Sequence, residues 1–383
     1  MVYLLGETLL RQQILICKYK NKFTKLNIEI IGIMVLKKSV FIVLFFLSLF
    51  EGFSQTGSFI QGFAKYSGYN RPFWADKHST LVTGEVALAL NAAEYDWAKT
   101  DKKIRPFIFA NLGADLPIWA GNFMDNKYGF SVTLPFFIDV WLDMFERTTA
   151  PVINTAYRFG LPEFVFIHRL DNPENSFVKN YSIKLSLLKH ECTHIGDELA
   201  IMRKNEGLPL TRVNVSSNYV ESVFTLNDPE NTVNSNHGFK FGIMVLHNFK
   251  DGWYSILPEE GDTSVVVPSK FPIEAFLQYQ YQSRVYANNF QIIGSIEWRN
   301  RAKYGYPLYY INKNEEWTAF PIPEYRSNSL NFATGVRYCA PSSQDAYFSK
   351  IGLAIRGYIG INPYGQFRSI PLYSQLGLVL IFE

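Results

Sequence analysis

The chain has 383 residues, a formal net charge of +3 and three cysteines. Seven basic and three acidic residues lie within the first 54 positions, so the remainder carries a formal charge of −1. This balance excludes the concentrated Lys/Arg face that binds nucleic acid, and we expect no nucleic-acid partner. Aromatic residues make up 16% of the chain. Such a composition, without a later apolar run of helix length, is typical of a sheet with aromatic girdles.

Residues 34–54 have the pattern of a secretory signal peptide. Lys37 and Lys38 precede the apolar run Val40–Phe50, in which Ser48 is the one polar residue, and small residues follow it. The run is half of the ~20 residues that a spanning helix needs, so it predicts export without anchoring. We expect residues 1–33 to lie upstream of the true start; a genuine N-terminal extension is the alternative.

The remaining residues, 55–383, are expected to form one all-β domain. The two-residue period is clearest from Pro272 to Tyr286, where apolar and polar side chains alternate over more than the ~9 to 11 residues of a tilted membrane strand. Soluble sandwich strands are usually shorter, about five or six residues.

The candidate strands number about twelve or thirteen, and because bacterial barrels prefer an even number, we predict an antiparallel transmembrane β-barrel of about 12 strands. In chain order the candidates are Phe59–Tyr66, Leu81–Leu90, Ile104–Leu112, Tyr128–Trp141, Val152–Phe159, Tyr181–His190, Val213–Leu226, Phe239–His247, Pro272–Tyr286, Phe290–Asn300, Asn331–Cys339, Ile351–Asn362 and Leu372–Phe382. Periodicity does not settle whether Phe164–Leu170 is part of a strand, a short helix or a plug.

Charged residues gather on the side of these strands that is expected to face inward. They are Lys184, Arg284, Glu297, Arg299, Arg337 and Arg356. The interior of a small barrel is usually filled by side chains, so this pattern favours a salt-bridged lumen over a substrate channel. The last strand ends at Phe382, beside the additional residue Glu383.

The most informative local pattern is HECTH at His190–His194. It satisfies the H-E-x-x-H pattern of zinc proteases, which needs a helix so that both histidines reach one ion. The preceding residues, Tyr181–Leu188, instead alternate like a strand. In a strand the two histidines lie roughly 13 Å apart, too far to share a metal ion. We therefore expect no metal and no cofactor here.

Strict alternation along this strand predicts which side chains face the lumen. The inward row comprises His190, Cys192 and His194, at the outer rim. The lipid-facing row comprises Ile183, Leu185 and Leu187, continued by Lys189, Glu191 and Thr193. Residues 195–212 form a long excursion, and long excursions in such barrels are extracellular. The same parity turns Cys192 and Cys339 inward, and an oxidising compartment permits a disulfide between them.

The run His190–Glu198 also resembles a family motif. Its His-x-Cys-x-His pattern leads into Gly-Asp-Glu, similar to the His-x-Ser-x-His-x-Gly-Asp-Glu segment of an uncharacterised family of bacterial outer-membrane β-barrel proteins. Asn362–Phe367 is similar to a second block of that family. The resemblance implies a barrel in the cell outer membrane of a Gram-negative envelope, with outer-membrane lipids as partners. It implies no activity and no oligomeric state.

A more distant likeness is to outer-membrane phospholipase A, whose barrel carries His-x-Ser on a strand near the outer leaflet and an Asn that orients the base. This likeness implies that His190 is a general base and that Cys192 stands where the nucleophilic Ser stands. Asn214 and Asn218 are the nearest candidates for the orienting Asn.

In the other interpretation, the histidines and acidic residues of the run form a hydrogen-bonded network that fixes a loop at the rim. The candidate site residues are His190, Cys192, His194, Asp197 and Glu198.

Three functional hypotheses follow. The leading one is an outer-membrane barrel of unassigned molecular function, structural or a narrow pore. The alternative is a barrel lipid hydrolase that uses His190 and Cys192 at the outer rim. The second alternative is a secreted zinc peptidase. Whether the protein is an enzyme stays open at this point.

Overall fold

The computed structural model contains two compact units, Met1–Gly57 and Ser58–Glu383, and nearly all described residues belong to the second. The predicted signal peptide and the candidate strand Phe59–Tyr66 lie outside the described residues. The structure describes residues 57–58, 70–90, 104–143, 151–171, 177–196, 205, 212–228, 237–254, 273–285, 289–301, 309–311, 317–319, 328–339, 350–363 and 373–383.

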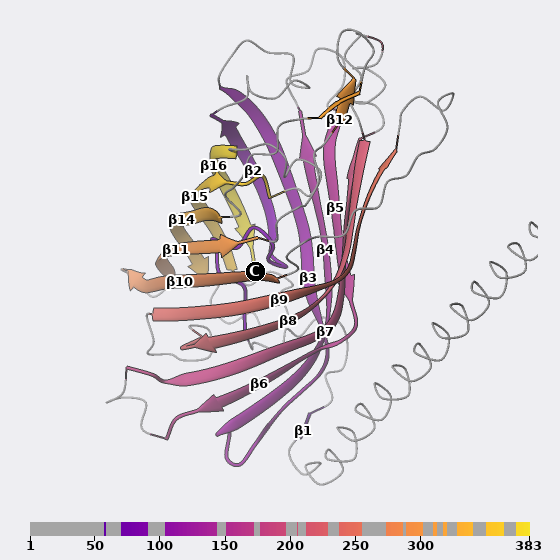
Figure 1. The fold of residues 1–383 in the computed structure, drawn as a ribbon. Helices are drawn as coiled ribbons and strands as arrows, with labels where there is room; N and C mark the ends of the chain where they lie inside the picture. The colour runs from indigo at the N-terminus through magenta and orange to yellow at the C-terminus, as the bar shows by residue number, and fades with distance from the viewer. Residues whose placement is uncertain are drawn as a thin grey trace, which may run out of the picture. The chain divides into compact units, whose positions relative to one another are not determined.

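Twelve antiparallel strands close into a barrel (Figure 1), which confirms the predicted fold class and strand number. The wall consists of β2 (Val82–Ala89), β3 (Arg105–Phe123), β4 (Tyr128–Leu142), β5 (Val152–Gly160) with β6 (Glu163–Arg169), β7 (Asn180–Ile195), β8 (Arg212–Leu226), β9 (His237–Tyr254), β10 (Ile273–Val285), β11 (Phe290–Asn300), β14 (Asn328–Cys339), β15 (Lys350–Gly360) and β16 (Tyr373–Phe382). The short strands are β1 (Gly57–Ser58), β12 (Tyr309–Ile311) and β13 (Trp317–Ala319).

Two features of the pairing explain this number. Strand β2 pairs with β3 on one side and with β16 on the other, which closes the wall. Strands β5 and β6 both pair with β4 and with β7, so together they form one strand of the wall. The segment Phe164–Leu170, unsettled from the sequence, therefore belongs mainly to β6. Among the described residues, no helix is long and apolar enough to cross a membrane.

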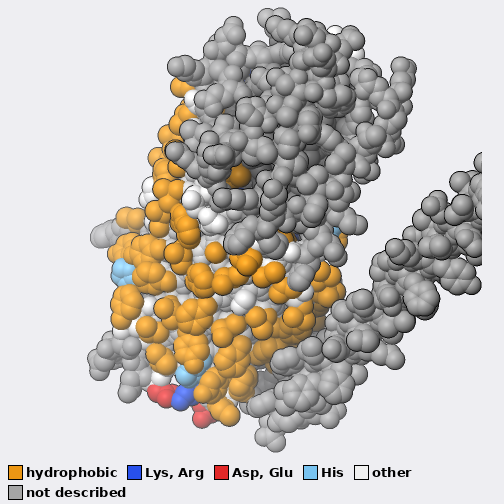
Figure 2. Space-filling model, in the orientation of Figure 1, with side chains coloured by type: hydrophobic (Ala, Val, Ile, Leu, Met, Phe, Trp, Pro, Cys, Tyr) orange, Lys and Arg blue, Asp and Glu red, His pale blue; other side chains and the backbone are white. Residues whose placement is uncertain are grey.

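The wall has an apolar outer surface and a polar inner one. On β10, Ile273 and Leu277 are exposed, whereas Glu274, Gln278 and Gln280 are buried, as their alternation predicts. Figure 2 shows hydrophobic side chains over most of the described part of this face, with Lys, Arg, Asp and Glu in view at its lower edge. An apolar outer band around a polar interior is the pattern of a transmembrane barrel.

Residues 70–81, which we call the luminal segment, lie inside the barrel and bind to its inward side chains. Trp74 is fully buried. Its backbone N–H donates to Gln280 Oε1 at 3.0 Å, and its carbonyl accepts from Arg356 Nη2 at 3.1 Å. Its indole Nε1 donates to Glu383 Oε1 at 2.5 Å, while Glu383 Oε2 pairs with Arg337 at 2.9 Å. Glu383, which follows the last strand, therefore binds both the luminal segment and the Arg337 side chain of the wall.

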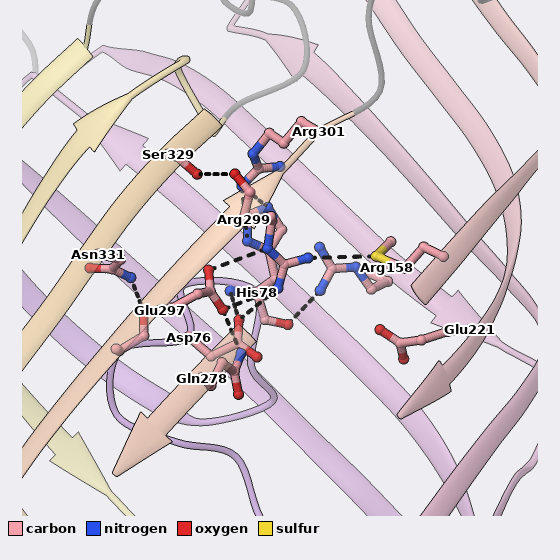
Figure 3. Close-up of polar contacts among 12 residues, drawn as sticks. Asp76, His78, Arg158, Glu221, Gln278, Glu297, Arg299, Arg301, Ser329 and Asn331 are labelled. Atoms are coloured by element: carbon pink, nitrogen blue, oxygen red, sulfur yellow. Dashed lines mark hydrogen bonds and ion pairs between the residues drawn. The ribbon is translucent and has the colours of Figure 1, made fainter. Parts of the chain in front are cut away.

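A charged network holds the rest of the luminal segment (Figure 3). Arg299 Nη2 lies 3.5 Å from Asp76 Oδ1 and 3.2 Å from Glu297 Oε2. Arg158 Nη1 donates to the carbonyl oxygen of His78 at 2.5 Å. The predicted salt-bridged lumen is confirmed for the residues whose side chains the structure describes, a set that does not include Arg284.

Aromatic side chains fill another part of the lumen. The Trp141 ring lies 5.3 Å from Phe107, 5.5 Å from Phe109 and 6.0 Å from Tyr373, measured between centroids. A cavity of about 60 Å³, lined by both charged and apolar side chains, lies beside the luminal segment. This volume suits a few water molecules and is small for a solute path.

The close approach of Trp74 to β15 predicts a steric effect at Gly352. A Cβ on Gly352 would lie 2.5 Å from the Trp74 ring. Gly352→Ala is therefore expected to displace Trp74 and lower the free energy of unfolding by about 1–3 kcal/mol. Urea unfolding of the purified barrel, followed by tryptophan fluorescence, measures the change.

The matched control is Gly294→Ala, because nothing lies within 4 Å of a Cβ at that position. The control should be nearly neutral. Equal destabilisation by both substitutions would contradict the packing of Trp74 against β15.

Candidate functional site

Strand β7 contains a β-bulge just before the histidines. Ser186 pairs with Glu221 of β8, but the next paired residue, Lys189, faces Tyr219. Leu187 and Leu188 therefore share one opposing residue. An inserted residue of this kind reverses the alternation of side chains beyond it.

The bulge reverses the predicted orientation of the candidate site. The buried, inward side chains beyond it are Lys189, Glu191 and Thr193. The half-buried, outward side chains are His190, Cys192 and His194. The His190 ring lies 5.0 Å from the ring of Phe159, which is 52% exposed on the outer wall. The prediction that the His-x-Cys-x-His row faces the lumen is wrong, because strict alternation takes no account of the bulge.

His190 has a hydrogen-bond partner on the neighbouring strand. It pairs directly with Asn218 of β8, and its Nδ1 lies 2.7 Å from Asn218 Oδ1. A carbonyl oxygen can only accept, so Nδ1–H donates and Nε2 is the nitrogen left able to take a proton. Of the two candidates for an orienting Asn, the structure brings Asn218 to His190. The side chain of Asn214 lies outside the described residues.

Cys192 lies on the same outer face, two residues beyond His190. Positions i and i+2 of a strand are ~6.5 Å apart along the backbone, which is within reach for a base and a nucleophile. Tyr157 pairs with Cys192 across the β5–β7 interface, and its ring lies 6.0 Å from that of His194. Tyr157, Phe159 and Leu188 give the site an apolar, exposed surround. The arrangement provides an oriented imidazole and a thiol on a lipid-facing wall.

An ion pair lies behind this face, inside the barrel. Arg158 of β5 pairs with Glu191 of β7, with Nη2 3.2 Å from Oε2. The Arg158 guanidinium also stacks 4.8 Å from the Phe137 ring and binds the carbonyl of His78. Sequence reasoning missed Arg158, because it lies in a predicted strand without any motif.

The zinc-peptidase alternative is contradicted by the secondary structure. His190–His194 lies entirely within β7, so the helical turn that would bring both histidines to one ion is not formed. Glu191 faces the lumen, away from both histidines. Asp197 and Glu198 lie outside the described residues, so the predicted rim network stays a prediction.

Comparison with known proteins gives no family. No family model matches the chain, and no curated protein matches it. Among solved structures, outer membrane phospholipase A from Escherichia coli is similar with 11% identity and a TM-score of 0.38, over 80% of this chain and 93% of that one. The Salmonella typhi outer membrane phospholipase dimer with bound calcium has 10% identity and a TM-score of 0.39, over 79% and 90%. A Pseudomonas aeruginosa FadL homologue has 8% identity and a TM-score of 0.35, over 85% and 98%. These values are low, and the fold assignment rests on the strand pairing.

The orientation of the two cysteines predicts their redox state. Cys192 faces outward on β7, whereas Cys339 is at an inward position of β14, and both thiols are free. The disulfide that the sequence permits is therefore not formed, because opposite sides of the wall separate the sulfur atoms. Alkylation of the unreduced, denatured protein should modify both cysteines, as mass spectrometry of their peptides would show. A peptide that links Cys192 to Cys339 would contradict this orientation.

Proposed function

We propose that this protein is an outer-membrane barrel that hydrolyses acyl ester lipids at the outer rim of its lipid-facing wall. The hydrogen bond from His190 Nδ1 to Asn218 Oδ1, 2.7 Å long and beside Cys192 on that wall, carries the proposal. It holds the imidazole in the tautomer that a general base needs.

The apolar outer surface supports a membrane location, because a soluble chain rarely exposes so large a continuous apolar area. The predicted signal peptide supports export. The connections after β7, β9 and β11 span residues 196–211, 255–272 and 301–327, longer than those at the other end of the barrel. Longer connections belong to the extracellular side, so the site would lie near the outer leaflet.

The proposed reaction has two steps. In the first, His190 Nε2 takes the thiol proton and Cys192 Sγ attacks the ester carbonyl carbon. The carbon–oxygen bond to the alcohol then breaks, and His190 gives the proton to the departing oxygen. In the second, His190 takes a proton from water, and the hydroxide attacks the thioester. The thioester opens to a fatty acid and the restored thiol. Asn218 orients His190 throughout.

The leading sequence-based hypothesis, a structural barrel or a narrow pore, is less well supported. Neither role requires an oriented imidazole on the lipid face. The luminal segment and the inward side chains occupy the described part of the lumen, which argues further against a pore. A purely structural barrel would be inactive, so an activity assay separates it from the proposed hydrolase.

The hydrolase proposal predicts ester-specific turnover. The full chain, purified in detergent, should release fatty acid from a diacyl phospholipid and none from its diether analogue. Cys192→Ala and His190→Ala should abolish release. Asn218→Ala should lower kcat by about 10²-fold, because the base loses its orientation. Cys192→Ser should retain part of the activity, because a hydroxyl can replace the thiol.

His237→Ala is the matched control. His237 is also a half-buried histidine, and its Nδ1 lies 2.8 Å from Tyr279 Oη, at the opposite end of the barrel. Its replacement should leave turnover unchanged. Fatty-acid release that survives both Cys192→Ala and His190→Ala would remove the proposed site.

The filled lumen predicts electrical silence. The chain reconstituted into a planar lipid bilayer should give no stepwise ion conductance, because luminal residues such as Trp74 and Arg299 are packed and paired. Reproducible unitary conductance steps from the purified chain would revive the pore hypothesis.

A further inference from the structure

Four charged side chains, three of them buried and one half-buried, lie inside the barrel, directly behind the bulge of β7. They are Lys184 and Lys189 of β7, Glu163 of β6 and Glu221 of β8. We refer to them as the lysine–glutamate cluster. Two positive and two negative charges balance within it.

Lys189 is the centre of the cluster. Its Nζ lies 2.5 Å from Glu163 Oε1 and 2.5 Å from Glu221 Oε2. Lys184 Nζ lies 3.6 Å from Glu163 and 3.5 Å from Glu221. Lys189 therefore joins the strands on both sides of β7, and it is the first inward residue after the bulge.

The residue on the other side of the bulge also binds the lysine–glutamate cluster. Ser186, the last inward residue before the bulge, donates from Oγ to Glu163 Oε1 at 2.6 Å. Glu163 thus holds both Ser186 and Lys189, the two residues that flank Leu187 and Leu188.

The backbone at the junction of β5 and β6 contacts the bulge of β7. The junction of β5 and β6 lies opposite, and Leu161 N–H donates to the carbonyl oxygen of Leu188 at 2.9 Å. A Cβ on Gly160 would lie 2.5 Å from that oxygen, so glycine permits the approach. The bulge is therefore supported by backbone contacts on one side and by buried charges behind it.

We propose that Lys189 is a positioning residue of the candidate site: its ion pairs with Glu163 and Glu221 hold the bulge in β7 and thereby keep His190 and Cys192 on the lipid-facing wall. The expected effect of Lys189 on turnover rests on the proposed hydrolase function. The expected effect of Lys189 on the direction of Cys192 does not.

The charges explain why the bulged register is preferred. Without the extra residue, Lys189 and Glu191 would turn to the apolar outer surface, where a charge is costly. Glu163 and Glu221 would remain buried and lose the nearer of the two cations that they share, which is also unfavourable. The bulge relieves both costs and turns the uncharged row outward as a result.

The thiol of Cys192 gives a direct measure of this direction. In the full chain carrying Cys17→Ala and Cys339→Ala, reconstituted in lipid vesicles, the rate of N-ethylmaleimide addition to Cys192 would be followed by mass spectrometry. Lys189→Met should slow the addition about tenfold, because Cys192 spends most of its time turned into the packed lumen. Lys189→Arg, which keeps the cation, should restore most of the rate.

Arg337→Met is the matched control. Arg337 is an equally buried luminal cation, paired with Glu383, on β14. Its replacement should leave the labelling of Cys192 unchanged. Wild-type labelling of Lys189→Met, or equal slowing by Arg337→Met, would overturn the positioning role. If Lys189→Met does not fold, Glu221→Gln decides: it keeps the Glu163 pair and should slow labelling partially, and an unchanged rate overturns the role.

Fatty-acid release measured on the same variants distinguishes the two proposals. A parallel fall in labelling and release supports both. A fall in labelling with a wild-type chain that releases no fatty acid leaves the positioning role in place and removes the hydrolase. Loss of release with unchanged labelling overturns the positioning role alone.

Discussion

Each side chain on a barrel strand faces either the lumen or the lipid, and one inserted residue exchanges the two directions for the rest of the strand. In β7 this exchange occurs between Ser186 and Lys189. Upstream, Leu185 is exposed and Ser186 is buried; downstream, Lys189 is buried and His190 reaches the outer wall. The chemistry of the candidate site depends on this single change of direction. Without it, charged residues would face lipid, and the imidazole and thiol would face a packed interior.

The interior of this barrel is too wide for wall side chains alone to fill, so an additional segment packs inside it. Eight strands give an interior that wall side chains can fill, and the diameter grows with strand number. Twelve strands leave more room, which residues 70–81 occupy with Trp74 at their centre. The segment is bound through paired charges, as between Asp76 and Arg299. Because Arg158 binds both the His78 carbonyl and Glu191, the luminal segment and the strand that carries the candidate site share one contact.

Alternation made the wall predictable from the sequence. In β10 and β11 most residues of the outward face are apolar, and alternation predicts the inward face of both strands correctly. The luminal segment was not found, because residues 70–81 have no period and Trp74 binds residues more than 200 positions away, such as Gln280. Its contacts come from strands that are far apart in the sequence, so no local pattern encodes them.

The sequence did not predict the direction of the candidate site residues. The Leu187–Leu188 pair carried a usable signal: two adjacent apolar residues followed by Lys189 and Glu191 would, under strict alternation, expose charges to lipid. A bulge avoids the free-energy cost of charges in lipid, because it turns Lys189 and Glu191 into the lumen. Asn218 was one of two candidates, and only the pairing register of β7 with β8 selects it.

The outward direction also determines how a substrate could reach His190. The luminal route is occupied by Trp74 and the Trp141 ring cluster, whereas the imidazole lies beside Phe159 on the exposed wall. A molecule that reaches it must arrive laterally along the barrel, in contact with exposed aromatic and aliphatic side chains. A lipid already held in the bilayer meets this condition without leaving its apolar surroundings, whereas a water-soluble ester would have to enter them. In the proposed hydrolase, the geometry of the wall would therefore favour substrates held in the membrane over water-soluble ones.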